Sequence, residues 1–315
     1  MPGGLTAVPG SARLRLLPDL TIILGISVFS AFLSGSRQWA GFNSPDSEFY
    51  ASLALFGSDV TDRAIEPAYT WTRLGYIAPV RLLVTAGDPW VGFAVWRFLL
   101  ILVIVASTYL LVKRASNRVL AVGVALFASL NTMVLSYVGN PYLTGTIMAA
   151  STLFLALAVW CNLGSERARW LPGVLSGLVA GWLVMLNPYA LFLALSMWLA
   201  VRAVGLFMGQ EQRWRRLLVD AGAGAAGFAV SIAGFLAAGA VIFPGRSWFG
   251  TYLDWNGRLD YASFISDPNI WTRDVTLFVP ASALIISLIA LAVTRANRWS
   301  LIATAIAGMN ILFTW

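Results

Sequence analysis

The sequence contains no histidine and only one cysteine, Cys161. Imidazole is therefore excluded as a general base and as a metal ligand, and disulfides and cysteine-rich zinc sites are excluded as well. Charged residues make up only 11% of the chain, and Lys113 is its one lysine. Any acid–base chemistry must therefore use aspartate, glutamate, tyrosine, or water held by arginine.

Glycine motifs that cradle nucleotide phosphates are also missing. The chain has no GxGxxG motif after a strand pattern and no GxxxxGKS motif, so nothing predicts a nucleotide-binding domain. Instead, glycines recur at small-residue spacing inside apolar segments, where we expect close contacts between packed helices. These glycines are Gly173, Gly177, Gly181, Gly222, Gly224 and Gly227.

Long apolar runs dominate what is present. Hydrophobic residues make up 59% of the chain, and the mean hydropathy is +0.77, far from the average of soluble domains. Runs of about 17 to 25 apolar residues predict an all-α membrane protein, a polytopic helical bundle of about nine spans. The run 171–201 is too long for one span, and we divide it at Asn187-Pro188-Tyr189, because proline disfavours helix in the residue before it. The other predicted spans are 20–36, 91–112, 119–138, 143–163, 221–243, 275–294 and 299–315.

The distribution of charge predicts an orientation. Most basic residues fall in alternate connections on the side of the N-terminus, and most acidic residues fall on the other side. The positive-inside rule then predicts a multi-pass protein of the plasma (inner) membrane with a cytoplasmic N-terminus and its functional surface outside. The net charge is +7. We expect the basic residues that carry it to face membrane lipid, and we expect no nucleic-acid partner.

Both ends of the chain raise questions of processing. Asp19 is an unusual residue for the core of a signal peptide, so we expect the first apolar run to be an uncleaved anchor. The last apolar run ends without a polar tail. We therefore expect residues 1–315 to form a single membrane module that is truncated relative to a longer protein.

Two outer connections, 37–90 and 244–274, are long, charged and aromatic, and we expect binding surfaces there. In the first, Ser44-Pro45 predicts the start of a short amphipathic helix on the membrane surface, with Phe49, Leu53 and Phe56 on its apolar face. Asp46 and Glu48 fall in its first turn, about 200° apart around the helix, so they cannot face one site. Acidic residues in a first turn are also common caps.

Aromatic residues and arginines alternate through both outer connections. Arginine forks bind phosphate, and aromatic faces stack on sugar rings, but an interfacial aromatic belt with snorkelling arginines has the same composition. Arg97 differs, because it lies inside the second apolar run, where a charge is a functional hypothesis by default. A divalent cation with Asp46 as one ligand stays open as a cofactor, although no loop has metal-binding spacing and no other cofactor is indicated.

The motif from Ser44 to Tyr50, which follows a first span with a cytoplasmic N-terminus, resembles the GT-C superfamily of integral membrane glycosyltransferases. This superfamily includes protein mannosyltransferases, aminoarabinose transferases and actinobacterial cell-wall transferases. The turn Gly139-Asn140-Pro141-Tyr142 and the glycine-rich segment from Gly181 to Pro188 are similar to features of that superfamily. The sequence departs from it in having Asp-Ser-Glu instead of adjacent acids, and in lacking the distal spans and an outer C-terminal domain.

The resemblance implies an inverting transferase that moves a sugar from a polyprenyl-phosphate donor to a lipid- or glycan-linked acceptor. An enzyme acting outside the cell has no nucleotide sugar, which agrees with a lipid-linked donor. Asp46 would be the general base, with Glu48 as the alternative. The donor phosphate would be held by Arg73, Arg258, Arg63 and Arg273. Sugar and acceptor would be contacted by Tyr50, Tyr69, Trp71, Asp254 and Trp255.

Two other functions remain open from the sequence. A transporter or lipid flippase predicts ionisable groups deep in the spans and paired broken helices, for which Arg97 and the Asn187-Pro188 break are the only indications. A noncatalytic GT-C-like scaffold subunit is the other alternative, and the abrupt C-terminus agrees with it.

Overall fold

The computed structural model describes residues 10–35, 45–61, 70–139, 143–163, 170–188, 190–207, 214–258 and 285. Within these ranges the regular structure is helical throughout. The helices are α1 (Gly10–Gly35), α2 (Pro45–Phe56), α3 (Ser58–Thr61), the 3₁₀ turn η1 (Thr70–Thr72), α4 (Leu74–Thr85), α5 (Pro89–Ala115), α6 (Arg118–Leu130), α7 (Thr132–Gly139), α8 (Leu143–Leu163), α9 (Trp170–Leu186), α10 (Ala190–Phe207), α11 (Trp214–Ile242) and α12 (Trp248–Arg258).

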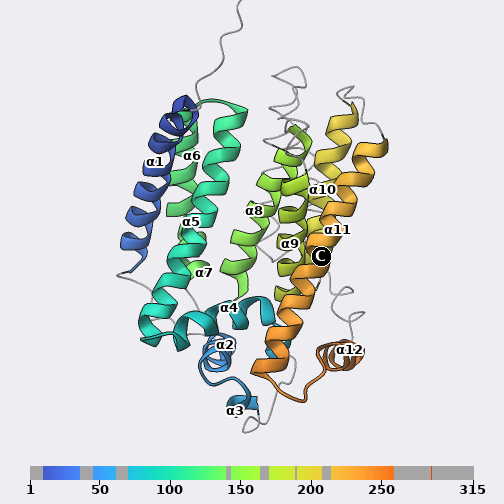
Figure 1. The fold of residues 1–315 in the computed structure, drawn as a ribbon. Coiled ribbons are helices and arrows are strands. Elements are labelled where there is room, and N and C mark those ends of the chain that lie inside the picture. Colours follow the sequence, from blue (N-terminus) through green and yellow to red (C-terminus); the bar gives the residue numbers. More distant parts are fainter. Residues whose placement is uncertain are drawn as a thin grey trace, which may run out of the picture.

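The long helices lie side by side in a bundle, as Figure 1 shows. The most extensive contacts join α9 to α11, α5 to α6, and α8 to α9. The short helices α2, α3 and α4, together with α12, lie at one end of the bundle (Figure 1), which we call the loop end. At the opposite end, α5 finishes and α6 begins.

Three of the described helices are long and apolar enough to cross a membrane: Pro89–Ala115, Leu143–Cys161 and Leu218–Ile242. Several apolar side chains lie on the outside of the bundle, and Phe32, Val119 and Val241 are about four-fifths exposed, at 79%, 83% and 83%. Apolar helices that present such side chains outward indicate a membrane-embedded helical protein. The count of nine spans and the orientation stay predictions. Apart from Ile285, the predicted spans 275–294 and 299–315 lie outside the described residues.

Two helix breaks have local causes. As the proline predicted, α9 ends at Leu186 and α10 begins at Ala190, whose amide donates to the carbonyl of Asn187 at 2.8 Å. The second break differs from the sequence prediction, which gives one span over 119–138, whereas the structure divides this run into α6 and α7. The chain leaves the helix at Asn131 (φ −59°, ψ 128°), and the Leu135 amide then bonds to the Asn131 carbonyl at 2.9 Å to start α7. Asparagine is one of the preferred residues at such a helix start.

Glycines allow α9 and α11 to touch through their backbones. A methyl group added at Gly177 would lie 1.9 Å from the Gly224 carbonyl oxygen, and one at Gly227 would lie 2.1 Å from the Val174 carbonyl oxygen. Additions at Gly181 and Gly173 would also meet α11 closely, at 2.6 and 3.1 Å. The predicted close packing is confirmed at these four positions. At Gly222 it is wrong, because no atom lies within 4 Å there.

Candidate functional site

Helix α2 begins at Pro45 as predicted, with Asp46 and Glu48 in its first turn. The Glu48 side chain is exposed, whereas that of Asp46 lies outside the described residues. The predicted apolar face needs correction. Leu53 is buried as expected, but Phe56 is 58% exposed, and the fully buried neighbours of Leu53 are Tyr50 and Ala54. The buried face of α2 is therefore rotated relative to the prediction.

The rotation follows from how α4 packs against α2. The Arg81 guanidinium on α4 reaches the end of α2, where its Nη1 donates to the carbonyls of Ala54 at 3.1 Å and Leu55 at 3.0 Å. These carbonyls belong to the last turn of α2, where backbone carbonyls have no donor within the helix. Helix α2 is thus fixed into the end of the bundle instead of only lying on a membrane surface.

A series of aromatic rings connects four helices at the loop end. Tyr50 of α2 meets Tyr76 of α4 with ring centroids 5.9 Å apart, and Tyr76 meets Trp96 of α5 at 6.4 Å. Trp96 then meets Trp182 of α9 at 6.3 Å, and all three contacts are edge-to-face. The Trp182 Nε1 donates to the Gly75 carbonyl at 2.7 Å. The rings form a packed aromatic base that joins α2 to α4, α5 and α9.

Two residues expected to contact sugar are part of this packing. Tyr50 and Trp71 are each only 2% exposed, and the Trp71 ring lies against Phe243 with centroids 5.5 Å apart. Both rings are core residues, so neither has a free face for a sugar to stack on. The physical reason is that large aromatic side chains close the end of the bundle, where helices alone leave apolar surface uncovered.

The loop end also contains buried hydrogen-bond donors without a described acceptor. Within the described part of the chain, the Tyr76 hydroxyl, Trp96 Nε1, Trp71 Nε1 and Arg97 Nη1 have no hydrogen-bond partner. Burial is the main cause that raises the pKa of Tyr76 well above its usual value, and the electrostatic effect of Tyr50 raises it further. The Tyr76 hydroxyl therefore keeps its proton. Tryptophan and arginine can only donate. Because buried polar groups are nearly always paired, this set suits a ligand rich in acceptor oxygens.

The predicted phosphate-binding arginines are only partly described. Arg73 is half-buried at the residue that precedes α4, and its Nε and Nη1 atoms are buried. Arg97 is also half-buried, inside α5 and directly after Trp96 in the sequence. Arg63, Arg273 and Tyr69 lie outside the described residues, as do the side chains of Trp255 and Arg258 in α12.

The second predicted binding loop meets the first at the loop end. The Trp248 Nε1 of α12 donates to the Thr72 carbonyl of η1 at 2.7 Å. The Trp248 ring stacks on Tyr252, with centroids 5.3 Å apart and planes 3° apart, and Phe249 lies against its edge. Asp254 is exposed on the same helix. Residues far apart in the sequence therefore form one surface.

No metal site is formed by the described side chains: no group of three or more acidic or cysteine residues lies close enough together to hold an ion. Asp46, the ligand considered for a divalent cation, has no described side chain. The cation therefore stays a prediction.

The sequence did not single out Tyr76, Trp96 and Trp182 as site residues. Tyr76 belongs to an aromatic segment of the first outer loop, and Trp182 belongs to the glycine-rich segment before the Asn187-Pro188 turn. One signal was present, since Trp96 is next to Arg97 inside an apolar run. An arginine at such a depth indicates a polar environment.

No protein-family model matches this chain, and neither a curated protein nor a solved structure matches it. The GT-C resemblance therefore stays a hypothesis that rests on the motif from Ser44 to Tyr50 and on the segments 139–142 and 181–188.

Proposed function

We propose that this protein is an inverting glycosyltransferase of the GT-C type, which moves a sugar from a polyprenyl-phosphate donor to an acceptor at the outer surface of the plasma membrane. The loop end is where the reaction would occur. The first turn of α2 brings carboxylates to this end, and Arg73 and Arg97 bring positive charge.

The observation that best supports the proposal is the set of buried donors formed by Tyr76, Trp96 and Arg97. A phosphate group and a sugar both present several acceptor oxygens. A donor-rich site therefore favours such a ligand over a cation or an apolar molecule, because each unpaired buried donor costs about 1–3 kcal/mol. The uncompensated guanidinium also favours an anion, since a charge inside an apolar bundle is expensive unless it is paired.

The proposed reaction proceeds in one displacement. The acceptor hydroxyl oxygen attacks the anomeric carbon, the bond from that carbon to the phosphate oxygen breaks, and polyprenyl phosphate leaves. The hydroxyl proton passes to Asp46 as general base. The Glu48 side chain is exposed, and hydration weakens a carboxylate as a base, so Glu48 is the alternative. The guanidinium groups of Arg73 and Arg97 would stabilise the charge that develops on the leaving phosphate.

The base is tested by measuring sugar transfer from a panel of polyprenyl-phosphate sugars in reconstituted membranes. Asp46→Asn is expected to lower the rate about 10²- to 10⁴-fold, the usual contribution of a general base. Asp59→Asn is the matched control, because Asp59 is an exposed carboxylate in the neighbouring α3. Wild-type turnover in both Asp46→Asn and Glu48→Gln would refute the proposed base.

The phosphate contact is tested in the same membranes. Arg97→Gln is expected to weaken polyprenyl-phosphate binding at least tenfold, because a charge-assisted hydrogen bond contributes about 1.5–3 kcal/mol. Arg114→Gln removes the same charge at the opposite end of the bundle, where Arg114 is exposed, and should bind normally. Equal affinity in all three proteins would show that Arg97 does not contact the phosphate.

A further inference from the structure

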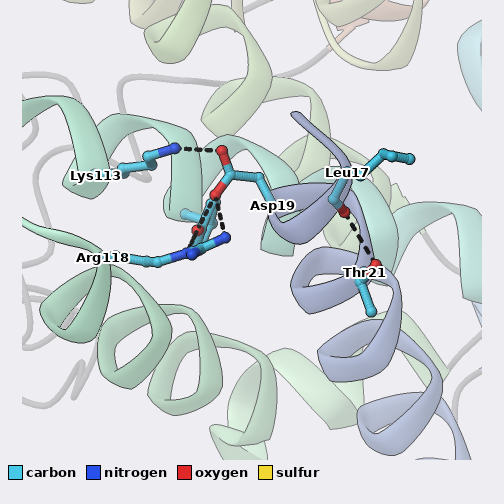
Figure 2. Close-up of polar contacts among 6 residues, drawn as sticks. Leu17, Asp19, Thr21, Lys113 and Arg118 are labelled. Carbon is cyan, nitrogen blue, oxygen red and sulfur yellow. Dashed lines mark hydrogen bonds and ion pairs between the residues drawn. The ribbon is translucent and has the colours of Figure 1, made fainter. Parts of the chain in front are cut away.

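A second polar cluster lies at the opposite end of the bundle, around Asp19 of α1. Asp19 is only 6% exposed and receives contacts from two other helices, as Figure 2 shows. The Tyr109 hydroxyl donates to its Oδ1 at 2.7 Å, and the Arg118 Nη2 lies 3.1 Å from the same oxygen. The Lys113 Nζ pairs with Oδ2, and the Arg118 Nε donates to the Tyr109 hydroxyl at 3.4 Å.

The cluster contains more positive than negative charge. Among the described residues, one carboxylate faces two cations, so one positive charge has no counter-charge there. The Lys113 and Arg118 side chains are 39% and 45% exposed, whereas that of Asp19 is 8% exposed. Lysine has three donors and arginine five, and these two residues make no other hydrogen bond or ion pair within the described ranges. Both partly exposed cations therefore keep donors that are not used within the described ranges.

The surroundings of the cluster are apolar and exposed. Leu17 and Leu20 are close to Asp19 in the sequence of α1, and Val119 and Leu120 follow Arg118 on α6; all four are exposed. Cations fixed next to exposed apolar side chains match the boundary between lipid tails and headgroups. A soluble anion would use only the cations, whereas a phospholipid would use the apolar side chains as well.

The geometry points to a binding site for the phosphate of an anionic phospholipid, with Lys113 and Arg118 as its two cationic ligands. Asp19 acts as a positioning residue, because it holds both cations at one place between α1, α5 and α6. The phosphodiester of the lipid supplies the missing negative charge, and its acyl chains lie along the exposed apolar residues of α1 and α6. The site is at the opposite end from the proposed sugar-transfer site and does not depend on that function.

The full chain is to be titrated in neutral detergent with phosphatidylglycerol and, separately, with phosphatidylcholine, and the bound lipid is counted by native mass spectrometry. We expect phosphatidylglycerol to bind preferentially to the wild type. Lys113→Gln and Arg118→Gln should each weaken its binding about fivefold, the effect of removing one cation near a membrane surface. Arg114→Gln is the matched control, because Arg114 is an exposed cation in the same last turn of α5.

The outcomes separate a built site from general attraction. An equal loss in Arg114→Gln and Arg118→Gln would overturn the proposal, because only diffuse charge would then matter. Full competition by millimolar inorganic phosphate would overturn it too, by showing a free-anion site. If Arg118→Gln does not fold, Arg118→Lys takes its place, because lysine keeps the positive charge but cannot bind a phosphate through two parallel hydrogen bonds as a guanidinium does. A selective loss of phosphatidylglycerol binding in Arg118→Lys or Lys113→Gln would support the site, and unchanged binding in both would overturn it.

Discussion

The contact between α9 and α11 makes a quantitative prediction. Replacing Gly177 by alanine would put the new Cβ 1.9 Å from the Gly224 carbonyl oxygen, whereas real Cβ contacts are essentially never shorter than 3.0 Å. The two helices must therefore separate locally by about 1.1 Å (3.0 minus 1.9). Neither side can adapt by a rotamer change, because an alanine Cβ is fixed by its backbone and the Gly224 carbonyl is itself backbone.

A separation of that size is expensive, since a gap of about 0.5–1 Å already removes a quarter to a half of the dispersion energy of the contacting atoms. Overpacking normally costs about 1–3 kcal/mol, and we expect Gly177→Ala to lie at the upper end, about 3 kcal/mol. The better helix propensity of alanine, about 1 kcal/mol, offsets only part of the cost.

The measurement is the thermal midpoint of the purified protein in detergent, monitored through the loss of monodisperse protein on heating. Gly222→Ala is the matched control on α11, because nothing lies within 4 Å of a methyl group there. We expect Gly177→Ala to lower the midpoint and Gly222→Ala to leave it unchanged or raise it. If the two variants have the same midpoint, the close backbone contact between α9 and α11 is refuted.

Two further variants test other contacts. Arg202→Met should destabilise the protein by about 3–5 kcal/mol, because it leaves Asp220 buried without the guanidinium that lies 2.7 Å from it. Adding Asp220→Leu should recover most of this loss in the same thermal assay. If stability is not recovered, the unpaired Asp220 charge is not the cause. Trp248→Phe removes the hydrogen bond to Thr72 and should lower the free energy of opening of α12 by about 1 kcal/mol, which is measured as faster amide hydrogen exchange in α12. Phe249→Leu, on the exposed side, should leave that exchange unchanged. Equal exchange rates in the wild type and both variants would contradict a stabilising contact between Trp248 and Thr72.

The general position of most helices could be predicted from the sequence, because it depends on local chemistry. Apolar runs bounded by charges predicted the long helices, Pro45 marked the start of α2, and Pro188 separated α9 from α10. Proline acts on its own residue and the one before it, whatever surrounds it. Asn131 shows the limit of this reasoning, since asparagine begins a helix in some settings and lies within one in others.

The faces and partners of those helices depended on residues far apart in the chain. Composition made Tyr50 and Trp71 look like sugar-binding residues, whereas contacts with Tyr76 and Phe243 bury them. The sequence shows that Asp19 is unusual in an apolar run, but it does not show that Lys113 of α5 and Arg118 of α6 pair with this carboxylate.

The sequence by itself determined that this chain is helical and apolar, where several of its helices begin and end, and that it has no histidine or cysteine-cluster chemistry. The tertiary structure decided which side chains meet at the loop end and which donors remain there without a described acceptor. The physical reason is that helix formation responds to neighbouring residues along the chain, whereas burial and hydrogen-bond pairing respond to helices that are close only after the bundle has packed.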